Sequence, residues 1–461
     1  MDIQKFYSSI QGKRVAFCGI GGSNLPLIKI FAQRGAAVTA RDRRTEEKLG
    51  ETAGELKELG VTLKLGEGYL ENLDEDIIFR TPGMKYYLPE LNAARERGAA
   101  VTSEMEVFFD LCPCKIFAVT GSDGKTTTTT ILSEMLKAAG KTVHLGGNIG
   151  NPLLPEIESI RPDDVAVVEL SSFQLISMRR SPDVAVVTNV TPNHLDMHKD
   201  MQEYIDAKKN ILLHQNAFGR AVLNADYEIT AGFAKDVRGD KLMFSRRGRC
   251  ARGAWLNDQN EIILSLDGKD FPVMSASEIR IPGGHNIENY LAAVCALWGT
   301  VGTDVMVRIA RTFSGVEHRN EFVRELDGVK YYNDSIGTTP SRTANGTLKL
   351  FDRKILLIAG GYDKKIPFGS FGPAVVDSVK TLVLMGATAD KIEQSVKAAP
   401  NYREGGPKII RVRSLEEAVE ACRAEAVPGD IVSLSPACAS FDMFPNYETR
   451  GEEFKKLVER L

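Results

Sequence analysis

The chain has 461 residues, 43% of them hydrophobic and 26% charged, with a formal net charge of −3 at pH 7 and a pI near 6.2. A chain of this length exceeds one compact core, so we expect two or three domains. The small net charge excludes a global attraction to nucleic acid or to an anionic membrane. An anionic substrate must therefore be held by local lysines, arginines and helix ends.

Neither a membrane segment nor a targeting signal is expected. No apolar run approaches the roughly 20 residues that span a bilayer, and Met1–Tyr7 has neither the charged start nor the apolar core of a signal peptide. The seven cysteines are odd in number and scattered, and the one close pair, Cys112 and Cys114, has neither zinc-knuckle nor thioredoxin spacing. We therefore expect a cytoplasmic monomer with idle thiols and with no nucleic-acid or membrane partner.

The N-terminal part of the chain is predicted to form a Rossmann-like domain. Arg14–Cys18 is typical of a buried strand, and it is followed by the glycine turn Gly19–Asn24, a helix over Leu27–Arg34 and a second strand over Ala36–Ala40. This βαβ order is typical of dinucleotide-binding folds. The turn lacks the third glycine of the full fingerprint, and arginines flank the acidic Asp42 that follows, so we expect the fold without a nicotinamide cofactor.

A further strand and turn complete this first domain. The strand Asp76–Phe79 ends in the turn Arg80–Met84, whose threonine and exposed N–H groups either contact a ligand or complete an ordinary turn. A helix over Glu104–Asp110 then leads into a new strand, where a second domain is expected to start. The sequence thus predicts three domains, over residues 1–105, 106–316 and 317–461.

The second domain begins with a glycine loop between a strand and a helix. The apolar run Lys115–Val119 is the expected strand, and the helix pattern begins after Lys125. Gly121 and Gly124 leave room for backbone N–H groups to turn toward a phosphate chain, and the helix start and Lys125 add positive charge. The hydroxyl of Thr126 stands where a P-loop places a Mg²⁺ ligand, although a valine replaces the first glycine of that motif. The flanking strand and helix favour nucleotide phosphate binding over a chance loop.

Several polar residues follow buried strands of the same domain. Asp164–Leu170 and Asp183–Asn189 are continuous apolar runs separated by helical segments, which indicates a parallel sheet covered on both faces. Ligands gather at the carboxyl ends of such strands. Asn148, Glu169 and the stretch Asn189–Asp196 are all expected at those ends, on the same edge as the glycine loop. This coincidence indicates one site.

Two of these residues have the chemistry of metal ligands. The Glu169 carboxylate and the His194 imidazole could complete magnesium or manganese sites beside ATP, with Asp196 orienting His194. Taken alone, each has an ordinary alternative, a strand-end salt bridge for Glu169 and a loop or capping role for His194. Composition alone predicts that Lys208 and Lys209 face solvent.

The rest of the chain is predicted to add strands to the central sheet and then to form a third α/β domain. Lys241–Phe244 and Glu261–Leu266 are expected to be added antiparallel strands, and a helix follows over Ile287–Trp298. The strands of the third domain are expected at Val329–Asp334, Ile355–Ala359, Thr381–Met385 and Asp430–Leu434. The fold class is therefore α/β, with a Rossmann-like N-terminal domain, a P-loop ATPase-like central parallel sheet and a Rossmann-like C-terminal domain.

Charged residues and one loop of the third domain indicate a second part of the site. Arg319, Asp334 and Lys364 begin or end elements there, and they could clamp a nucleotide between domains. The loop Ser435–Asp442 is small and polar after a buried strand, and its exposed N–H groups suit a carboxylate. Cys438 within this loop has no histidine nearby in the sequence, so we do not expect it to be a nucleophile.

Taken together, these segments resemble the Mur ligases, the ATP-dependent amide ligases that build the peptidoglycan stem peptide. The family pattern matches the phosphate loop Thr120–Thr126 and the segments Gly146–Gly150, Asn189–Asp196, His285-Asn286, His318-Arg319 and Asn333–Ser335. Two further motifs, Glu169–Leu175 and Ser435–Ser440, are similar to those of the members that add D-glutamate to UDP-N-acetylmuramoyl-L-alanine. The resemblance covers essentially the whole chain.

The resemblance implies a two-step reaction. The terminal carboxylate of UDP-N-acetylmuramoyl-L-alanine attacks the γ-phosphate of ATP and gives an acyl phosphate and ADP. The amine of D-glutamate then attacks the acyl phosphate, and phosphate leaves. Positioned phosphates and metals stabilise such charge-dense transition states. The implied cofactors are ATP, Mg²⁺ or Mn²⁺, and a CO₂-derived carbamate on Lys208, which would turn that cation into an anionic oxygen ligand.

The resemblance also implies a role for each matching residue. ATP would be bound by Gly121, Ser122, Asp123, Gly124, Lys125, Thr126, Thr127, Asn286, Arg319 and Asp334. The UDP substrate would be bound by Ser23, Asn24, Asp42, Arg43, Thr81, Pro82, Gly83, Asn148 and Ser171. D-Glutamate would be bound by Thr338, Lys364, Ser440, Phe441 and Tyr447. The metals would be held by Thr126, Glu169, His194 and the carbamate of Lys208, and the catalytic residues would be Lys125, Glu169, His194 and Lys208.

The chain departs from the family pattern at a few places. Asp123 replaces the usual asparagine of the phosphate loop and puts a negative charge near the phosphates. Ile336 stands where a lysine commonly follows Asn-Asp-Ser, so that lysine contact is lost. Lys364 and Lys365 compete for one role, which we assign to Lys364 on spacing, and Tyr447 stands where a phenylalanine is often found.

Three alternatives stay open on the sequence. The first is another amide ligase of the superfamily, one that adds L-alanine or a diamino acid, or a folylpolyglutamate synthase; the two selecting motifs oppose it. The second is a nicotinamide dehydrogenase built on the N-terminal βαβ unit, which the arginines around Asp42 oppose. The third is a non-catalytic nucleotide sensor, which would bind ATP but release no phosphate.

Overall fold

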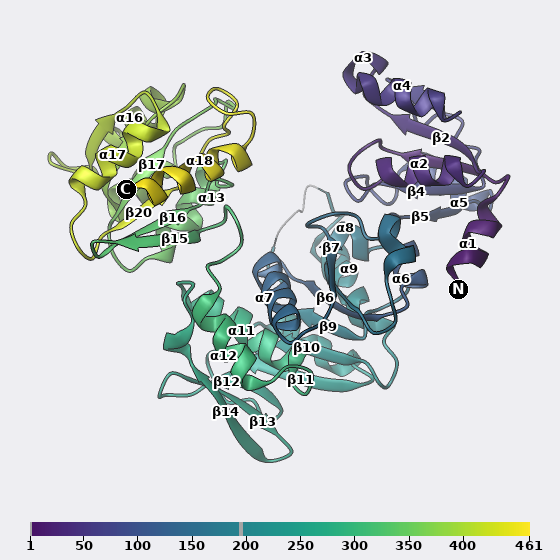
Figure 1. Cartoon of the computed structure of the whole chain (residues 1–461), viewed down its shortest axis with the longest axis horizontal. Helices are drawn as coiled ribbons and strands as arrows, with labels where there is room; N and C mark the ends of the chain where they lie inside the picture. Colours follow the sequence, from purple (N-terminus) through teal and green to yellow (C-terminus); the bar gives the residue numbers. More distant parts are fainter. Residues whose placement is uncertain (1, 193–196) are drawn as a thin grey trace. The chain divides into compact units, whose positions relative to one another are not determined.

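The computed structural model describes residues 2–192 and 197–461, which form three β-sheets covered by helices (Figure 1). The chain separates into two compact units, Met1–Glu278 with Ile287–Ala310, and Ile279–Asn286 with Arg311–Leu461. The first two sheets belong to the first unit and the third sheet to the second. In the described ranges, no helix is both long and apolar enough to cross a bilayer.

The first sheet has five strands, all parallel. Its elements are α1 (Ile3–Ile10), β1 (Arg14–Cys18), α2 (Leu25–Gln33), β2 (Ala37–Asp42), α3 (Glu46–Leu49), α4 (Glu51–Glu58), β3 (Thr62–Leu65), β4 (Ile77–Arg80), α5 (Pro89–Glu96) and β5 (Ala100–Thr102). The strand order β3-β2-β1-β4-β5 is a doubly wound order, which agrees with the predicted Rossmann-like fold. The ring of Phe17 stacks on that of Phe79 with centroids 4.7 Å apart, and Phe31 of α2 meets both edge-on. This aromatic cluster holds α2 on the sheet.

The second sheet has nine strands in the order β14-β13-β12-β11-β10-β9-β6-β8-β7. Its strands are β6 (Lys115–Thr120), β7 (Val143–Gly147), β8 (Val165–Glu169), β9 (Val184–Val187), β10 (Arg220–Asn224), β11 (Asp240–Ser245), β12 (Gly253–Leu256), β13 (Glu261–Leu266) and β14 (Lys269–Ser275). The helices are α6 (Glu104–Leu111), α7 (Lys125–Ala138), η1 (Leu154–Ser159), α8 (Ser172–Leu175), α9 (Met201–Leu213), α10 (Glu228–Gly232), η2 (Phe233–Asp236), η3 (Ala276–Glu278), α11 (Gly284–Leu297) and α12 (Thr303–Thr312). Strands β8 and β9 are buried along their whole length, as their continuous apolar runs predicted.

The direction of one added strand was predicted wrongly. The segment Lys241–Phe244 was expected to be antiparallel, but β11 pairs in parallel with β10, with Lys241 opposite Ala221. The cause is the crossover made by α10 and η2 between the two strands, because a crossover connection returns the chain in the same direction. The prediction for Glu261–Leu266 is confirmed, since β13 is antiparallel to both of its neighbours.

The third sheet has six strands in the order β15-β16-β20-β17-β18-β19. Its elements are β15 (Glu321–Leu326), β16 (Val329–Asn333), α13 (Pro340–Asn345), α14 (Thr347–Leu350), β17 (Ile355–Ala359), α15 (Phe371–Ser378), β18 (Val379–Leu384), α16 (Ala389–Lys397), β19 (Lys408–Arg411), α17 (Leu415–Glu425), β20 (Ile431–Leu434) and α18 (Tyr447–Arg460). All pairs are parallel except β15 with β16. Helices α17 and α18 pack on one face and α15 and α16 on the other. The four predicted strands are confirmed, and the two edge strands β15 and β19 were missed.

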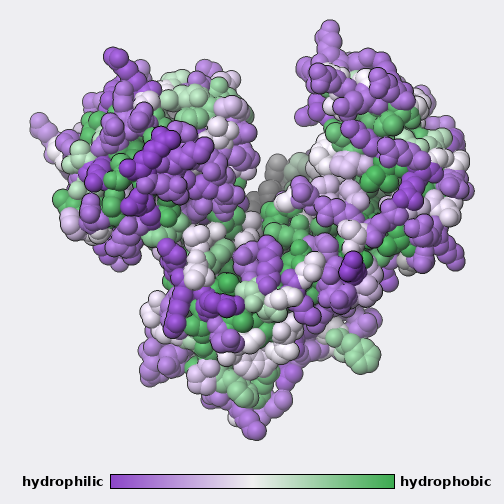
Figure 2. Space-filling model, viewed as in Figure 1, coloured by the Kyte–Doolittle hydropathy of each residue, from purple (hydrophilic) through white to green (hydrophobic). Residues whose placement is uncertain are grey.

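The first two sheets share a hydrophobic core. One cluster of buried side chains contains Phe31 of α2 together with Phe109 of α6 and Ile157 of η1. This shared packing explains why the first unit includes both sheets, and the predicted division at residue 105 stays a prediction. On the face drawn in Figure 2, polar residues cover most of the surface and apolar residues lie in scattered patches.

Candidate active site

The glycine loop between β6 and α7 is fixed by the neighbouring strand end. The Ser122 N–H donates to the Asn189 carbonyl at 2.8 Å, and the Asp123 N–H donates to Asn189 Oδ1 at 2.9 Å. Gly124 has a φ of 79°, and a Cβ there would stand 2.6 Å from Asn289 Oδ1, so the position requires glycine. The loop therefore has one defined shape before any ligand arrives.

These hydrogen bonds decide which donors of the loop face a phosphate. The N–H groups of Ser122 and Asp123 already bind Asn189, so they cannot serve as the predicted phosphate donors without leaving it. The first N–H groups of a helix have no partner within the helix, and here they follow the loop directly at the start of α7. Lys125 Nζ lies 3.0 Å from the Ser122 carbonyl, which keeps its charge over the loop. An anion would meet the helix start, where Thr126 and Thr127 also lie.

Glu169 ends β8 beside this loop, and its side chain is only partly satisfied. The residue is 1% exposed. Its Oε1 accepts a hydrogen bond from Asn148 Nδ2 at 2.7 Å, whereas Oε2 is buried without a hydrogen-bond partner in the part of the chain that the structure describes. A buried carboxylate oxygen without a partner is costly. The site therefore fits a divalent cation such as Mg²⁺, which prefers carboxylate oxygens.

Lys208 of α9 is buried against the loop, so the solvent-facing alternative is wrong. The residue is 2% exposed, its Nζ donates to the Gly121 carbonyl at 2.7 Å, and Nζ lies 4.7 Å from the centroid of the Tyr204 ring. Burial, and then the charge of Lys125, lower the pKa of Lys208 well below its ordinary value, although Glu169 acts in the opposite direction. The same burial favours the neutral amine of Lys208 over its charged form.

The predicted metal ligand His194 and its predicted partner Asp196 lie outside the described residues, so their roles stay predictions. A different histidine, His198, is 5% exposed near the start of α9. Its Nε2 lies 2.8 Å from Ser172 Oγ and its Nδ1 lies 3.2 Å from Glu203 Oε2. These contacts connect α9 to α8. His198 could not be predicted from the sequence, because a single histidine in a polar segment has no spacing pattern.

A cavity in the first unit brings together residues of the first and second sheets. Its volume is about 270 Å³, and its lining includes Ser23, Pro82, Asn148 and Gln174. Ser171 and Gln174 form a capping box at the start of α8: the Gln174 N–H donates to Ser171 Oγ at 3.3 Å, and the Ser171 N–H donates to Gln174 Oε1 at 2.9 Å. Three of the residues predicted for the UDP substrate thus line one cavity, and a fourth fixes the helix beside it.

The carboxylate of Asp42, at the end of β2, accepts hydrogen bonds from nearby residues of the same domain. Its Oδ2 accepts from the Ile20 N–H and from the Arg44 guanidinium, each at 2.8 Å. Burial raises the pKa of Asp42, but the hydrogen bonds from Arg44 and from the Ile20 N–H outweigh burial and lower the pKa to about 2. Arg44, which was not predicted, therefore holds the carboxylate in place, whereas the predicted Arg43 is exposed.

The other residues predicted for the UDP substrate lie at the turns after β1 and β4. Asn24 is 1% exposed and its Nδ2 donates to the Gly19 carbonyl at 3.0 Å. The Thr81 N–H donates to the Cys18 carbonyl at 3.2 Å, which sets the two turns side by side. Gly83, which completes the second turn, is exposed.

In the second unit, the Asp334 carboxyl group connects the end of β16 to the end of β20 by hydrogen bonds. It is 1% exposed, and its Oδ2 accepts from Thr347 Oγ1 at 2.8 Å and from Ser435 Oγ at 2.7 Å. Burial raises the pKa of Asp334, although the charge of Arg342 and these hydrogen bonds act to lower it. The other oxygen, Oδ1, accepts from the Asn320 N–H at 3.3 Å. The predicted nucleotide contact would thus come from a carboxyl group that also fixes the ends of β16 and β20.

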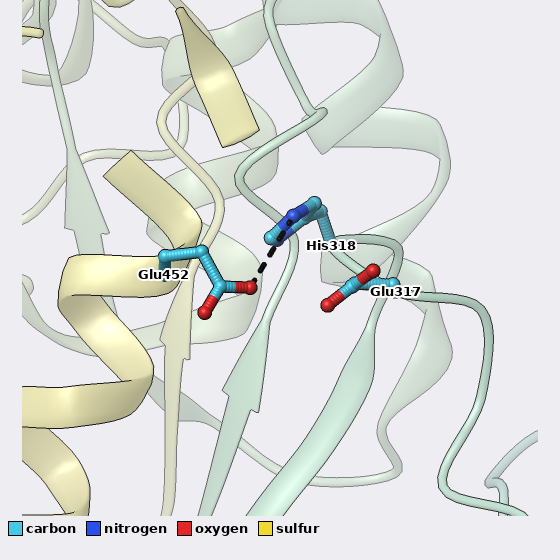
Figure 3. Close-up of side chains that lie close together, drawn as sticks. All are labelled: Glu317, His318 and Glu452. Carbon is cyan, nitrogen blue, oxygen red and sulfur yellow. Dashed lines mark ion pairs between the residues drawn. The ribbon is translucent and has the colours of Figure 1, made fainter. Parts of the chain in front are cut away.

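Glu317, His318 and Glu452 form the one group of three candidate metal ligands within residues 2–192 and 197–461 (Figure 3). His318 Nε2 lies 3.9 Å from Glu452 Oε1. The Lys455 ammonium lies 2.7 Å from Glu317 Oε1 and 2.7 Å from Glu452 Oε1. This cation balances the two carboxylates, so the group is an ion-pair cluster rather than a metal site.

The remaining predicted nucleotide contacts of this unit lie near its start. Asn286 is 7% exposed, and its Nδ2 donates to the Pro282 carbonyl at 2.6 Å. The Arg319 N–H donates to the Val316 carbonyl at 2.9 Å, which closes a turn before β15. The Asn286 side chain is therefore held by the turn before α11, and the Arg319 backbone is held by the turn before β15.

Lys364 and Thr338, predicted together for D-glutamate, lie together in the structure. Lys364 Nζ is 3.3 Å from Thr338 Oγ1. The competing Lys365 instead forms an ion pair with Asp363 at 3.0 Å. The assignment of the D-glutamate role to Lys364 rather than Lys365 stays a prediction.

The loop after β20 supplies the other residues predicted for D-glutamate. Ser440 is 2% exposed, whereas Phe441 is 64% exposed and its ring centroid lies 5.9 Å from that of Tyr362. The Tyr447 carbonyl accepts a hydrogen bond from Ser335 Oγ at 2.8 Å. The loop and the segment after β16 therefore meet at the start of α18.

Known proteins match the whole chain. Residues 119–297 match the Mur ligase middle domain, and residues 318–438 match the Mur ligase glutamate ligase domain. The UDP-N-acetylmuramoylalanine–D-glutamate ligase of Acetivibrio thermocellus is 52% identical over 460 residues, covering 99% of this chain and 98% of that protein. The ligase of the same name from Clostridium botulinum strain 657 is 49% identical over 461 residues, covering 100% and 99%. The chain belongs to the Mur ligase family.

Solved Mur ligase structures share the fold. The UDP-N-acetylmuramate-alanine ligase of Thermotoga maritima matches with a TM-score of 0.56 and 19% identity, covering 97% of this chain and 99% of that one. A UDP-N-acetylmuramoyl-L-alanyl-D-glutamate–2,6-diaminopimelate ligase matches with a TM-score of 0.55 and 17% identity, covering 93% and 87%. These likenesses concern the fold alone.

This Mur ligase also has a buried arginine that no sequence pattern predicted. Arg450 of α18 is 1% exposed, and burial lowers its pKa to about 10. Its Nη2 donates to the Ser335 carbonyl at 2.8 Å and to the Cys438 carbonyl at 3.2 Å, and its Nη1 donates to the Ala439 carbonyl at 3.3 Å. Arg450 therefore clamps the segment after β16 to the loop after β20. Its partners lie more than 100 residues away or are backbone atoms, and neither leaves a local signal.

Proposed function

We propose that this Mur ligase is an ATP-dependent enzyme that joins D-glutamate to UDP-N-acetylmuramoyl-L-alanine in peptidoglycan precursor synthesis. The observation that carries the proposal is the full-length likeness, at 52% identity, to a ligase of that name. The grouping of Lys125, Glu169 and Lys208 around one phosphate loop supports the use of ATP.

The reaction begins with activation of the substrate carboxylate. An oxygen of the L-alanyl carboxylate forms a bond to the γ-phosphorus of ATP while the bond to ADP breaks. The amine of D-glutamate then forms a bond to the acyl carbon, loses a proton, and phosphate leaves with the bridging oxygen. Lys125 and the helix start after it would hold the phosphates, because in-line transfer needs positioning and charge neutralisation more than covalent help.

Glu169 and Thr126 would hold Mg²⁺, with His194 as the further predicted ligand. The unpartnered Oε2 of Glu169 supports this role. When bound, the ion neutralises charge on the phosphate oxygens and brings the reacting groups together. Asn148, which donates to the other oxygen of Glu169 at 2.7 Å, orients the carboxylate.

Lys208 would be carbamylated by CO₂. Carbamate formation joins the nitrogen of a neutral amine to the carbon of CO₂ and releases a proton from that nitrogen, and burial favours the neutral amine of Lys208. The carbamate is an anion with two oxygens, and so it offers a metal the ligand type that a lysine amine does not. In this form the residue would add a second anionic group to that of Glu169 beside the phosphate loop.

The substrates would bind on two parts of the chain. The UDP substrate would occupy the cavity lined by Ser23, Pro82 and Asn148 in the first unit. The D-glutamate carboxylates would meet the paired Lys364 and Thr338 and the N–H groups of the loop after β20. We also infer that the enzyme acts in the cytoplasm as a monomer, where ATP and nucleotide-linked precursors are available.

Replacing Arg450 with methionine is expected to raise the KM for D-glutamate by about tenfold or more, because each lost charge-assisted hydrogen bond weakens the loop by roughly 1.5–3 kcal/mol. The KM for ATP should change little. Arg450→Lys keeps the charge but not the forked geometry, so it should recover only part of the affinity. Steady-state kinetics with each substrate varied in turn checks this. Equal rises in all KM values would instead indicate general damage to the fold.

Phosphate release from ATP tests the proposed function. UDP-N-acetylmuramoyl-L-alanine is present throughout, and D-glutamate, L-glutamate, L-alanine, L-lysine and meso-diaminopimelate are added one at a time. We expect release with D-glutamate alone. Release with a different amino acid would move the chain to another Mur-type specificity. No release with any of them would refute the proposed ligase activity.

A further inference from the structure

Two thiols lie in contact at the junction of α6 and β6. Cys112 follows the last residue of α6, and Cys114 directly precedes β6. Their Sγ atoms are 3.6 Å apart. Cys112 is half-buried and Cys114 is 7% exposed. Pro113 between them has a fixed φ, which restricts the backbone that carries both side chains.

This pair has no place in the proposed ligase reaction. The six residues of β6 separate Cys114 from the glycine loop, a span of about 20 Å at ~3.3 Å per residue. All seven cysteines of the chain are free thiols, and the other five are buried. The two thiols before β6 can therefore react without disturbing the residues proposed for the ligase reaction.

We propose that Cys112 and Cys114 form a reversible thiol–disulfide site, which a peroxide oxidises to an intramolecular disulfide and a dithiol reductant restores. The two sulfur atoms are already in contact, so closure to a bond length of ~2.05 Å needs a movement of only about 1.5 Å. This proposal is independent of the proposed ligase function.

The surroundings assign a different role to each thiol. Cys112 is the more accessible of the two, and the hydrogen bond from Cys114 lowers its pKa. The same contact, together with burial, raises the pKa of Cys114. The thiolate is the reactive form of cysteine, so Cys112 is the attacking group and Cys114 the resolving one.

The oxidation balances with one molecule of peroxide. The Cys112 thiolate attacks one oxygen of hydrogen peroxide, an S–O bond forms, the O–O bond breaks, and hydroxide leaves and takes up a proton. The Cys114 thiol then attacks the sulfenic sulfur, the S–S bond forms, the S–O bond breaks, and a second water leaves. Two thiols lose two electrons and two protons in total. A dithiol returns them by thiol–disulfide exchange.

The sequence makes the test simple, because a single tryptic peptide, Gly98–Lys115, contains both thiols and no other cysteine. The folded full chain is treated with hydrogen peroxide, blocked with N-ethylmaleimide, digested without reductant and weighed by mass spectrometry. We expect this peptide to be lighter by two hydrogen atoms and to carry no maleimide. After dithiothreitol it should carry two.

Variants and a second probe sharpen the result. Cys112→Ser and Cys114→Ser should each abolish the loss of two hydrogens, whereas the matched control Cys250→Ser should keep it. Phenylarsine oxide, which needs two adjacent thiols, should protect the peptide from maleimide in the wild-type chain without any oxidant. The proposal would be overturned if the peptide carried two maleimides both after hydrogen peroxide and after phenylarsine oxide. It would also be overturned if Cys112 were oxidised to sulfinic acid while the Cys114 thiol stayed free. The wild-type readouts need no variant, so a folding defect in a serine variant does not affect the test.

Discussion

Lys208→Ala is expected to lower ligase turnover by more than ~100-fold, the upper end of the loss seen when groups that support a metal are removed. Alanine deletes the buried nitrogen that donates to the Gly121 carbonyl and that would carry the carbamate. Turnover at saturating ATP and both other substrates measures the effect.

Lys209→Ala is the matched control. Lys209 is the next residue on α9, but its ammonium forms an ion pair with Asp236 rather than a contact with the loop. We expect its removal to leave turnover within a few-fold of the wild type. Near-normal activity of Lys208→Ala, or an equal loss in both variants, would remove Lys208 from the catalytic site.

The carbamate itself has a separate signature. Because carbamate formation consumes CO₂, wild-type enzyme kept free of CO₂ and bicarbonate should lose activity and regain it when bicarbonate is added. Enzyme incubated with ¹³C-labelled bicarbonate should show a carbamate carbon signal that Lys208→Ala lacks. A labelled signal that persists in the variant would assign the modification to another lysine.

Glu169→Gln is expected to have the second large effect, a loss of turnover of about 100-fold or more. The glutamine oxygen can still accept from Asn148, so the substitution preserves the contact at Oε1. It replaces the unpartnered Oε2 by an NH₂ group, which cannot bind a cation. The loss therefore reports on metal binding rather than on packing.

The dependence of the rate on Mg²⁺ concentration distinguishes a loss of metal binding from a loss of packing. The Mg²⁺ concentration for half-maximal activity should rise in Glu169→Gln, and high Mg²⁺ or Mn²⁺ should recover part of the rate. Glu156→Gln, at an exposed glutamate of the same unit, should leave both values unchanged. An unchanged Mg²⁺ requirement in Glu169→Gln would contradict the ligand role.

Local patterns explain what the sequence predicted correctly. A strand, a glycine loop and a helix start are adjacent in the chain, so Gly124 and Lys125 could be placed at the loop and the helix start before the fold was known. Glu169 ends the buried strand β8 and Asn148 follows β7, and the carboxyl ends of parallel strands meet at one edge. Their hydrogen bond at 2.7 Å confirms that these two strand ends meet.

Contacts across long separations explain what the sequence did not predict. Lys208 lies 87 residues from its partner Gly121, so its contact with the loop could not be predicted from α9 alone, and only the family resemblance singled it out. Arg450 binds the Ser335 carbonyl 115 residues away. The direction of β11 depends on the crossover before it rather than on its own residues. Such features appear only when the chain is folded.

The most direct test of the central claim follows an oxygen atom. UDP-N-acetylmuramoyl-L-alanine is labelled with ¹⁸O in its terminal carboxylate and incubated with the enzyme, ATP and D-glutamate. The mass of the released phosphate is then measured by mass spectrometry. Transfer through an acyl phosphate predicts one ¹⁸O atom per phosphate and a nucleotide product heavier by one glutamate residue. Unlabelled phosphate would mean that water cleaves the ATP, and it would contradict the assignment of this chain as a carboxylate-activating D-glutamate ligase.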